Sequence, residues 1–380
     1  MSRKIKILHI QETIGSGGVE RRRLSLAKYL DKNIFEQRII CCHSAGNIVE
    51  EIIKEEVKVD IIGNLNSPIH WSQHKKVQKI IEEYKPDIIH GAVFEGVTMA
   101  AINGCYKKVP IVIIEETSDP KNRTWKGDLL MRFFSKLSDK VIGVSEGVTQ
   151  EYLKDKLKLS SSKAITISNG VSMPRIVSDK EIIEAKEKLG INKNDLVIGS
   201  VGRMADDEHK RYSDLLRSFA EISKKNNFVK LLLIGQGPLL NYYKELSQKL
   251  GISNRVIFLG YQSDVSLYYK LMDIFTLVSA REAFGLVLAE AMLSELPVVA
   301  TKVGGMKYIV DDRKTGFLVE PKNIVEITER LEKLLGNPEL RHQMGINGFE
   351  KAKKNYLEEM YVKKIHDLYI NCLKSKGITT

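Results

Sequence analysis

The sequence lacks the features of a membrane-spanning or disulfide-bonded protein. None of its apolar runs approaches the ~20 residues that a helix needs to cross a bilayer. The first apolar run, residues 5–10, is interrupted by Lys6 and His9, so we expect a β-strand there rather than a signal peptide. The four cysteines follow neither a metal-binding spacing nor a disulfide framework, and the adjacent pair Cys41 and Cys42 is typical of a reducing cytosol. We therefore expect a cytoplasmic protein.

Acidic residues are outnumbered: 59 Lys and Arg face 48 Asp and Glu, which gives a net charge of +11. This charge alone would admit nucleic acid as a partner, but no zinc-finger, RNP-like or helix-turn-helix signature accompanies it. An anionic substrate, or peripheral contact with the anionic inner face of a membrane, agrees better with the charge. Low-complexity segments and short repeats are also absent.

The chain has an ordinary globular composition, with 43% hydrophobic and 28% charged residues, and its 380 residues suffice for two domains. Short apolar strands alternate with helical segments, which is typical of a parallel sheet covered on both faces. The alternation pauses at residues 168–179 and then begins again. We expect one Rossmann-like domain over residues 1–173 and a second over residues 174–355.

The apolar pattern gives the expected elements. In the first domain it predicts strands at 5–10, 37–42, 57–62, 87–90, 111–115, 141–145 and 165–168, and helices at 20–30, 72–84, 125–137 and 146–156. In the second it predicts strands at 197–202, 229–234, 256–259, 274–278, 297–300 and 317–319, and helices at 180–190, 212–224, 239–250, 286–293, 326–335, 339–353 and 356–374. Open parallel sheets bind ligands at the carboxyl ends of their strands, so we expect the site there.

Two glutamates in residues 279–297, Glu282 and Glu290, are the strongest chemical signal. The helix predicted at 286–293 is apolar on all sides, so we expect it to be buried, with Glu290 as its only charge. A buried carboxylate is costly unless it accepts hydrogen bonds, and sugar or ribose hydroxyls are suitable donors. Glu282 lies in the loop before the helix, beside the amides of residues 284–286, which can seat an anion. The alternative is a surface loop carboxylate and a Glu290 paired with a nearby lysine.

Glycines and cations follow other strand ends. The turn at residues 15–18 precedes a helix, but it is not a GxGxxG fingerprint, because Glu20 and Arg21 stand where the third glycine would be. A plain tight turn is an equal interpretation. Arg203, directly after the strand-end Gly202, can neutralise a diphosphate together with Lys210. The alternative is that these cations pair with the acids at 206–208.

Three further features carry weaker signals. His90 ends a strand and is either a cleft residue or a satisfied core histidine. Glu115 and Glu116 end another strand and point to opposite faces, so one of them can face the cleft. The apolar and basic stripe in the helix at 125–137 is typical of either a membrane surface or a core, and we favour the core.

Taken together, these residues resemble the retaining GT-B glycosyltransferases of family 4, which include capsular polysaccharide, lipopolysaccharide and phosphatidylinositol mannosyl enzymes. The resemblance is strong over REAFGLVLAE (281–290), AMLSELPVVAT (291–301), VGRM (201–204), LLLIGQGP (231–238) and VIFLGY (256–261). It is looser in the first domain, over SGGVERRRLSLAKYL (16–30), GVSEGV (143–148) and ISNGV (167–171).

The resemblance implies two Rossmann-like domains facing across a deep cleft, with a C-terminal helix over 356–380 that packs back on the first domain. It implies a nucleotide-sugar donor, a UDP- or GDP-sugar, that is moved with retention of configuration to a glycan or lipid-linked acceptor, without metal or a tightly bound cofactor. Arg203 and Lys210 would hold the diphosphate, Glu282 the donor sugar and Glu290 the ribose. The remaining donor-side positions are Gly17, Gly18, Gly202, Gly260, Tyr261, Phe284, Gly285 and Leu286, and the acceptor-side candidates are His90 and Glu116.

Departures from the family pattern bear on these roles. Glu116 stands where members often carry a histidine, and the loop from Arg203 to Lys210 is longer than usual. A GT-B-shaped epimerase and a catalytically silent nucleotide-sugar binding protein are the alternative functions.

Overall fold

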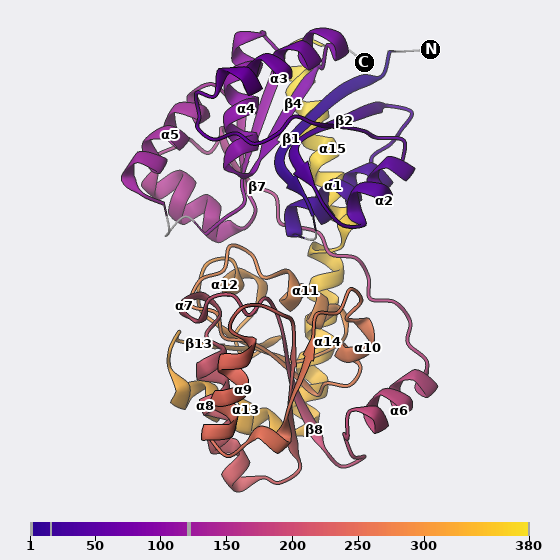
Figure 1. Cartoon of the computed structure of the whole chain (residues 1–380), viewed down its shortest axis with the longest axis vertical. Coiled ribbons are helices and arrows are strands. Elements are labelled where there is room, and N and C mark those ends of the chain that lie inside the picture. Colours follow the sequence, from indigo (N-terminus) through magenta and orange to yellow (C-terminus); the bar gives the residue numbers. More distant parts are fainter. Residues whose placement is uncertain (1–2, 16, 120–122, 379–380) are drawn as a thin grey trace. The chain divides into compact units, whose positions relative to one another are not determined.

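The computed structural model describes residues 3–15, 17–119 and 123–378. The chain folds into two compact units (Figure 1). Unit 1 comprises Met1–Gly170 and Glu358–Thr380, and unit 2 comprises Val171–Leu357. The sequence places these boundaries at 173/174 and 355/356.

Unit 1 is built on a seven-stranded sheet in the order β3-β2-β1-β4-β5-β6-β7, in which every adjacent pair is parallel. The strands are β1 (Ile5–Ile14), β2 (Phe35–Ser44), β3 (Lys58–Ile61), β4 (Ile88–Ala92), β5 (Ile111–Glu116), β6 (Lys140–Gly143) and β7 (Ala164–Thr166). All seven were expected from the sequence, and β1 runs four residues further than predicted, to Ile14 rather than residue 10.

Helices cover both faces of this sheet. They are α1 (Gly18–Tyr29), α2 (Ile48–Lys54), α3 (Trp71–Tyr84), α4 (Val93–Tyr106), α5 (Trp125–Lys136), the π-type η2 (Val148–Lys156) and α15 (Glu358–Ser375). One face packs against α3, α4, α5 and η2, and the other against α1, α2 and α15. The C-terminal helix α15 lies beside α1 (Figure 1).

Unit 2 repeats the plan with a six-stranded parallel sheet in the order β10-β9-β8-β11-β12-β13. The strands are β8 (Leu196–Val201), β9 (Val229–Ile234), β10 (Val256–Gly260), β11 (Ile274–Leu277), β12 (Val298–Thr301) and β13 (Gly316–Val319). The helices are α6 (Asp179–Lys188), α7 (Asp207–Lys210), α8 (Tyr212–Lys225), α9 (Leu240–Lys249), η3 (Ser253–Arg255), α10 (Ser266–Tyr269), α11 (Leu286–Leu293), α12 (Met306–Ile309), α13 (Ile324–Leu335) and α14 (Pro338–Asn355). The predicted α/β class and strand-helix alternation are confirmed.

The sequence interpretation missed α2 and α4 in unit 1. Helix α4 is almost wholly apolar and its residues 97–101 are buried, so no polar face marks a helical period. It begins at Val93, whose φ of 63° is rare for a β-branched residue, and it contains Gly96 and Gly104. A Cβ at Gly96 would lie 2.3 Å from the carbonyl oxygen of Ile10, so the glycine lets α4 pack directly on β1. Close packing, rather than helix propensity, determines this element.

The interpretation of the α5 stripe as core is only half right. Phe134 is 1% exposed and lies in the core between α5 and the sheet. In contrast, Leu129 is 60% and Phe133 is 50% exposed. The helix is therefore apolar on its outward side as well as its inward side.

A fully buried ionic cluster joins α1, β4, β5 and α15 inside unit 1; we call it the Glu115 cluster. Arg22 Nη1 lies 3.0 Å from Glu115 Oε2, and His90 Nε2 lies 2.9 Å from Glu115 Oε1. The Tyr369 hydroxyl lies 2.6 Å from His90 Nδ1, and Arg23 Nη2 lies 3.7 Å from Glu115 Oε2. Breaking a buried pair by removing one partner is strongly destabilising, so the cluster fixes how α15 and α1 sit on the sheet.

The cluster also sets its own protonation states. Burial lowers the pKa of His90 to about 4, against the opposing effect of Glu115. Burial would raise the pKa of Glu115, but Arg22, Arg23 and His90 hold it well below its usual range. At neutral pH the cluster therefore contains a neutral His90, whose protonated Nε2 lies beside the Glu115 carboxylate while Nδ1 accepts from the Tyr369 hydroxyl.

We predict that the free energy of unfolding falls as pH drops from about 7 to about 5. The folded-state pKa of His90 is about 4, below the unfolded value near 6.5. The unfolded chain therefore takes up the proton first, and His90 alone costs about 2 kcal/mol of stability over this window. Urea unfolding followed by circular dichroism at both pH values measures the loss.

His90→Gln should lower stability at neutral pH and remove about 2 kcal/mol of the pH dependence. His43→Gln is the matched control, because His43 is exposed at the end of β2. An unchanged pH dependence in His90→Gln would contradict the prediction.

Candidate functional site

The predicted donor-side residues of unit 2 gather at the carboxyl ends of three neighbouring strands. Strands β8, β11 and β12 are adjacent in the sheet. Gly202 and Arg203 follow β8, and Glu282 lies in the loop after β11; the loop after β12, which contains Gly304, was not among the predicted positions. Parallel pairing brings these loops to one edge, as the sequence predicts for a ligand site.

The centre of this edge is an ion pair between Lys210 and Glu282. Lys210 Nζ donates to Glu282 Oε2 at 2.7 Å, and the two side chains are 27% and 20% exposed. The backbones beside the two side chains are also joined, because Ala280 N donates to the His209 carbonyl oxygen at 2.7 Å. The sequence analysis singled out both side chains for different parts of a donor and did not predict that they pair.

A short helix positions Lys210. Helix α7 is capped by Asp206, whose carboxylate accepts from the Glu208 amide at 2.9 Å. Asp207 accepts from the Ser213 amide at 3.0 Å and from the Tyr243 hydroxyl at 2.9 Å. Two acids that the sequence offered as partners for the cations instead order the backbone that carries Lys210.

Arg203 and Arg211 have different environments. Arg211 donates two hydrogen bonds to Asp214, at 2.8 and 2.9 Å, and so has a structural role. Arg203 is exposed, and no hydrogen bond or ion pair joins it to another residue in the described part of the chain. Its backbone is nevertheless fixed, because the adjacent Met204 is buried and its amide donates to the Gln236 carbonyl oxygen at 3.1 Å. The guanidinium of Arg203 is therefore free of partners among the described residues, while its backbone is held in place.

The double glycine after β12 supports the backbone of Glu282. Gly305 N donates to the Glu282 carbonyl oxygen at 3.1 Å. Gly304 has a φ of +47°, and a Cβ there would lie 1.8 Å from the same oxygen. No side chain fits, so a glycine is needed for the loop carrying Glu282 to rest on the loop after β12.

Glu282 also lies at the start of α11. The N-cap residue Gly285 has a φ of +100°, which favours glycine. Its Cα is close to Glu282, because a Cβ on Gly285 would lie 3.6 Å from Glu282 Cγ. Phe284 is 3% exposed and its ring packs edge-on against Tyr356, with centroids 5.6 Å apart. Buried Phe284 thus anchors a helix N-terminus, which attracts anions, next to the carboxylate.

The prediction that α11 is buried on all sides is wrong, and so is the burial of Glu290. Leu286, Val287 and Glu290 are half-buried, whereas Leu288, Ala289 and residues 291–293 are buried. Positions 286, 287 and 290 share one face of a helix, so this face is turned away from the core. The Tyr269 hydroxyl, itself on a 1% exposed residue, donates to Glu290 Oε2 at 3.0 Å. The carboxylate therefore has a donor and reaches solvent.

The remaining donor-side positions follow β10. Gly260 has a φ of +78° and its carbonyl oxygen accepts from Gly235 N at 2.8 Å. The adjacent Tyr261 is 59% exposed at the same edge of the sheet. One further polar group was missed: Ser279 Oγ is fully buried and has no hydrogen-bond partner among the described residues. The signal for it was its place directly after a strand of the predicted site.

In unit 1 the carboxylate of Glu20 packs against the glycine turn. Ser16 lies outside the described residues. A Cβ on Gly17 would lie 2.5 Å from Glu20 Oε2, and Thr13 Oγ1 donates to Glu20 Oε1 at 2.9 Å. Gly18 begins α1. The glycines thus make room for Glu20 at the helix N-terminus, which is the plain-turn interpretation of this motif.

His90 and Glu116 are both engaged by neighbours. His90 is fully buried in the Glu115 cluster, and this placement favours the satisfied core histidine over a cleft residue. Glu116 is 1% exposed, lies 2.6 Å from Arg123 Nη2 and accepts from the Ser118 hydroxyl at 2.7 Å. Residues 120–122 of the loop between them lie outside the described residues.

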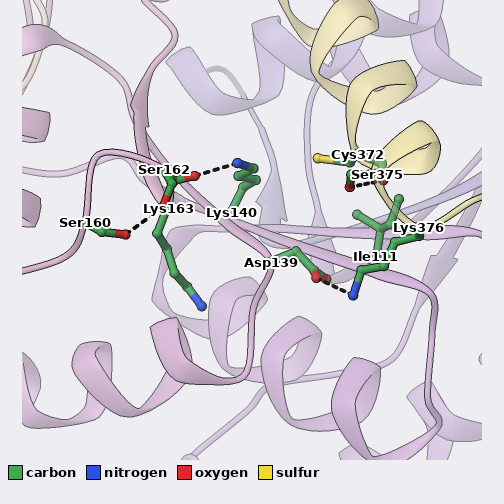
Figure 2. A pocket seen from close by; sticks show the side chains of 9 residues that line it. All are labelled: Ile111, Asp139, Lys140, Ser160, Ser162, Lys163, Cys372, Ser375 and Lys376. Carbon is green, nitrogen blue, oxygen red and sulfur yellow. Dashed lines mark hydrogen bonds and ion pairs between the residues drawn. The ribbon is translucent and has the colours of Figure 1, made fainter.

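A separate pocket of about 300 Å³ in unit 1 has no predicted site residue (Figure 2). It lies where β5, β6 and β7 begin, between this edge and the end of α15, as Ile111, Lys140 and Cys372 show. Its lysines have protein partners: Lys376 pairs with Asp139 at 2.9 Å, and Lys140 donates to the Ser162 carbonyl oxygen at 2.5 Å. This is the edge opposite to that where parallel sheets bind ligands.

The residues that the structure describes lack two further features. No group of three or more His, Cys, Asp or Glu residues there is arranged to hold a metal ion. None of the helices in the same residues is long and apolar enough to cross a membrane.

Comparison with known proteins assigns the family. The model of glycosyl transferases group 1 matches residues 181–351, and that of glycosyltransferase family 4 matches residues 16–175. The chain belongs to the family 4 glycosyltransferases of GT-B fold.

Relatives of this family 4 glycosyltransferase differ in what they are named for. It is 29% identical over 245 residues to an N-acetyl-alpha-D-glucosaminyl L-malate synthase from Bacillus anthracis; the match covers 64% of this chain and 63% of the relative. It is 25% identical to a UDP-Gal:alpha-D-GlcNAc-diphosphoundecaprenol alpha-1,3-galactosyltransferase from Escherichia coli, over 98% of both chains. Crystalline HepE from Anabaena in complex with UDP has a TM-score of 0.85, 22% identity, and coverage of 97% of this chain and all of the other.

We predict that Gly304→Ala destabilises unit 2 of the glycosyltransferase more than Gly251→Ala does. Both glycines have positive φ, +47° and +71°, but a Cβ at Gly251 meets nothing within 4 Å. Gly251→Ala should cost about 1 kcal/mol from the backbone alone, whereas Gly304→Ala adds the clash with Glu282. Urea unfolding of the two variants measures the difference. If both variants lost the same free energy of unfolding, the loop around Glu282 would have moved to accept the Gly304→Ala methyl group without an energetic cost.

Proposed function

We propose that this chain moves a sugar from a nucleoside-diphosphate sugar to an acceptor hydroxyl, with retention of configuration at the anomeric carbon. The observation that carries the proposal is the Lys210–Glu282 pair beside the N-terminus of α11. It places a cation, a carboxylate and a helix terminus at the carboxyl edge of one sheet. A sugar diphosphate needs positive charge for its phosphates, which the cation and the helix terminus supply, and an acceptor for its sugar hydroxyls, which the carboxylate supplies.

The diphosphate is assigned to the cations. Arg203 is exposed on a fixed backbone, and Lys210 is partly exposed and held at one side by Glu282. When the bond between the anomeric carbon and the phosphate oxygen breaks, its electron pair stays on the diphosphate. Arg203, Lys210 and the amides at residues 284–286 stabilise that charge, so the proposal needs no metal for the leaving group.

The carboxylates are assigned to the donor's hydroxyl groups. Glu282 holds the sugar that reacts, and Glu290, with Tyr269 behind it at 3.0 Å, holds the ribose. The half-buried position of Glu290 supports this role better than the full burial predicted from the sequence, because a ligand can reach it. Gly202 and the segment 259–261 would border the phosphates and the base.

The acceptor is proposed from the relatives. The name of the relative from Escherichia coli specifies a UDP-galactose donor and a lipid-diphosphate-linked sugar acceptor, and HepE was crystallised with UDP and with UDP-glucose. We therefore propose a UDP- or GDP-sugar as donor and a glycan or lipid-linked saccharide as acceptor. A lipid-linked acceptor implies a reaction at a membrane surface and a protein in peripheral contact with it.

The proposal is tested by incubating the protein with a panel of UDP- and GDP-sugars and measuring nucleoside diphosphate release, with and without glycan and lipid-linked acceptors. We expect slow hydrolysis of one donor, faster release with an acceptor, and a product whose anomeric configuration by NMR matches that of the donor. Interconversion of the sugar without release would indicate an epimerase. Binding without any turnover across the panel would indicate a silent binding protein.

Arg203→Ala should weaken nucleoside diphosphate binding in the same assay by roughly 10- to 100-fold, the range for losing a hydrogen bond to a charged group. Arg217→Ala is the matched control, because it removes the same charge from an exposed position on α8. Equal affinity in the two variants by calorimetry would remove Arg203 from the site.

We predict that Glu282→Gln and Glu290→Gln fail in different ways. Glu290 would contact the unreactive ribose, so its loss weakens ground state and transition state alike and raises KM more than it lowers kcat. Glu282 would orient the sugar that gains positive charge at the anomeric carbon, so its loss lowers kcat by roughly 100-fold while donor affinity is kept. Steady-state kinetics and calorimetry on both variants measure the two effects. Loss of affinity alone in both would refute the assigned roles.

A further inference from the structure

Helix α5 in unit 1 is apolar on its outward side, although nothing in the described chain covers that side. Its inward residues Met131 and Phe134 are 0% and 1% exposed. Its outward residues Trp125, Leu129 and Phe133 are 71%, 60% and 50% exposed. Large apolar side chains at such exposure, gathered on one helix, mark an interaction surface rather than ordinary scatter.

The three outward residues form one line along the helix. They are four positions apart, and each step of four advances the helix by about 40°, so the line spans about 80° of its circumference and about 12 Å of its length. Trp125 occupies the N-terminal end, where the Thr124 side chain accepts from the Gly127 amide at 3.2 Å and caps the helix. The stripe is therefore held on a regular, capped element.

Cations flank the stripe on both sides. At about 100° per residue, Arg132 lies at one border, Lys126 at the other and Lys136 between, and all three are exposed. The ammonium group of Lys126 lies 5.7 Å from the centre of the Trp125 ring. We call these residues together the α5 patch: Trp125, Lys126, Leu129, Arg132, Phe133 and Lys136.

The acid of α5 does not offset this charge. Asp128 pairs with Lys156 of the neighbouring η2 at 2.7 Å and accepts from the Tyr152 hydroxyl at 3.0 Å. Its side chain is 15% exposed. Arg132 donates from Nη2 to the Lys156 carbonyl oxygen at 2.7 Å, which fixes α5 against η2 and leaves the other N–H groups of the guanidinium available. The α5 patch thus presents three cations, and the carboxylate of the nearby Asp128 is neutralised by Lys156.

We propose that the α5 patch docks on an anionic lipid bilayer. Trp125, Leu129 and Phe133 would enter the boundary between headgroups and acyl chains, while Lys126, Arg132 and Lys136 contact the lipid phosphates. A helix with an apolar stripe, flanking Lys and Arg and an aromatic residue at its end has the chemistry of an interfacial helix. Protein interfaces, in contrast, are depleted of lysine, so a second copy of this chain is the less suitable occupant.

The proposal does not depend on the sugar chemistry. Its experiment measures binding of the full chain to vesicles of phosphatidylcholine with phosphatidylglycerol, and of phosphatidylcholine alone, by flotation. We expect binding to the anionic vesicles to be at least about tenfold tighter, and to weaken as salt is added. Equal binding to both vesicles, or none to either, would overturn the proposal.

Two triple variants separate the contributions of the patch. Trp125, Leu129 and Phe133 changed to Ala should weaken binding to anionic vesicles by about tenfold or more through lost apolar contact. Lys126, Arg132 and Lys136 changed to Gln should abolish the preference for anionic lipid. The donor-hydrolysis rate in solution should stay unchanged in both, because the proposed donor site lies in unit 2.

Matched controls remove the same groups elsewhere. Ile176, Ile183 and Phe228 are 95%, 57% and 62% exposed in unit 2, and their change to Ala should leave vesicle binding intact. Lys180, Lys188 and Lys193 are also exposed there, and their change to Gln lowers the net charge equally. A loss in the control variants equal to that in the patch variants would show nonspecific attraction and overturn the assignment to α5.

Fluorescence gives a direct readout of insertion. The chain has two tryptophans, so the Trp71→Phe variant leaves Trp125 as the sole reporter. Anionic vesicles should shift the Trp125 emission to shorter wavelength, and lipids brominated in the acyl chain should quench it. An unquenched Trp125 in the vesicle-bound protein would place a different surface on the bilayer. Self-association without vesicles that is lost in the apolar triple variant would assign the patch to a second copy instead.

Discussion

Parallel pairing of β8, β11 and β12 is the constraint on which the candidate site depends. Three loops leave the same edge of the sheet because the three strands run in one direction and lie next to one another. Hydrogen bonds between the loops then set finer positions: Ala280 bonds to His209, and Gly305 to Glu282. Lys210 and Glu282 are 72 positions apart in the chain. The backbone of the two loops therefore brings these side chains together.

The two units manage buried and half-exposed charge in opposite ways. In unit 1 the Glu115 cluster is fully buried, and the Glu115 carboxylate lies between Arg22, Arg23 and His90, which suits a group that fixes helix positions. In unit 2 the charges at the strand ends remain partly in contact with solvent, and Arg203 is left without a partner among the described residues. An anionic ligand requires cations that are accessible and not fully engaged by protein partners. The accessible charges of unit 2 therefore agree with a donor site there.

Much of the fold could be predicted from the sequence, because short apolar runs that alternate with helical segments are local signals. Strand β9 has the predicted bounds, whereas α4 was missed because its helical period is hidden when all sides are apolar. The site was predicted as a set of residues but not as a geometry. The pairing of Lys210 with Glu282 depends on strand order, and the exposure of Glu290 depends on which side of α11 meets the sheet. The outward side of α5 could not be separated from its core side, because both are apolar.

The placement of α15 has a consequence for how the chain acquires its structure during synthesis. Unit 2 is continuous in sequence, from Val171 to Leu357, whereas unit 1 needs Glu358–Thr380 to complete its second face. On the ribosome, unit 2 can therefore fold as soon as its own residues have emerged. The first residues of unit 1 are synthesised earliest, but unit 1 cannot complete its packing until α15 has been synthesised, after all of unit 2. Until then His90 lacks its partner Tyr369. The first half of the polypeptide is thus the last to mature.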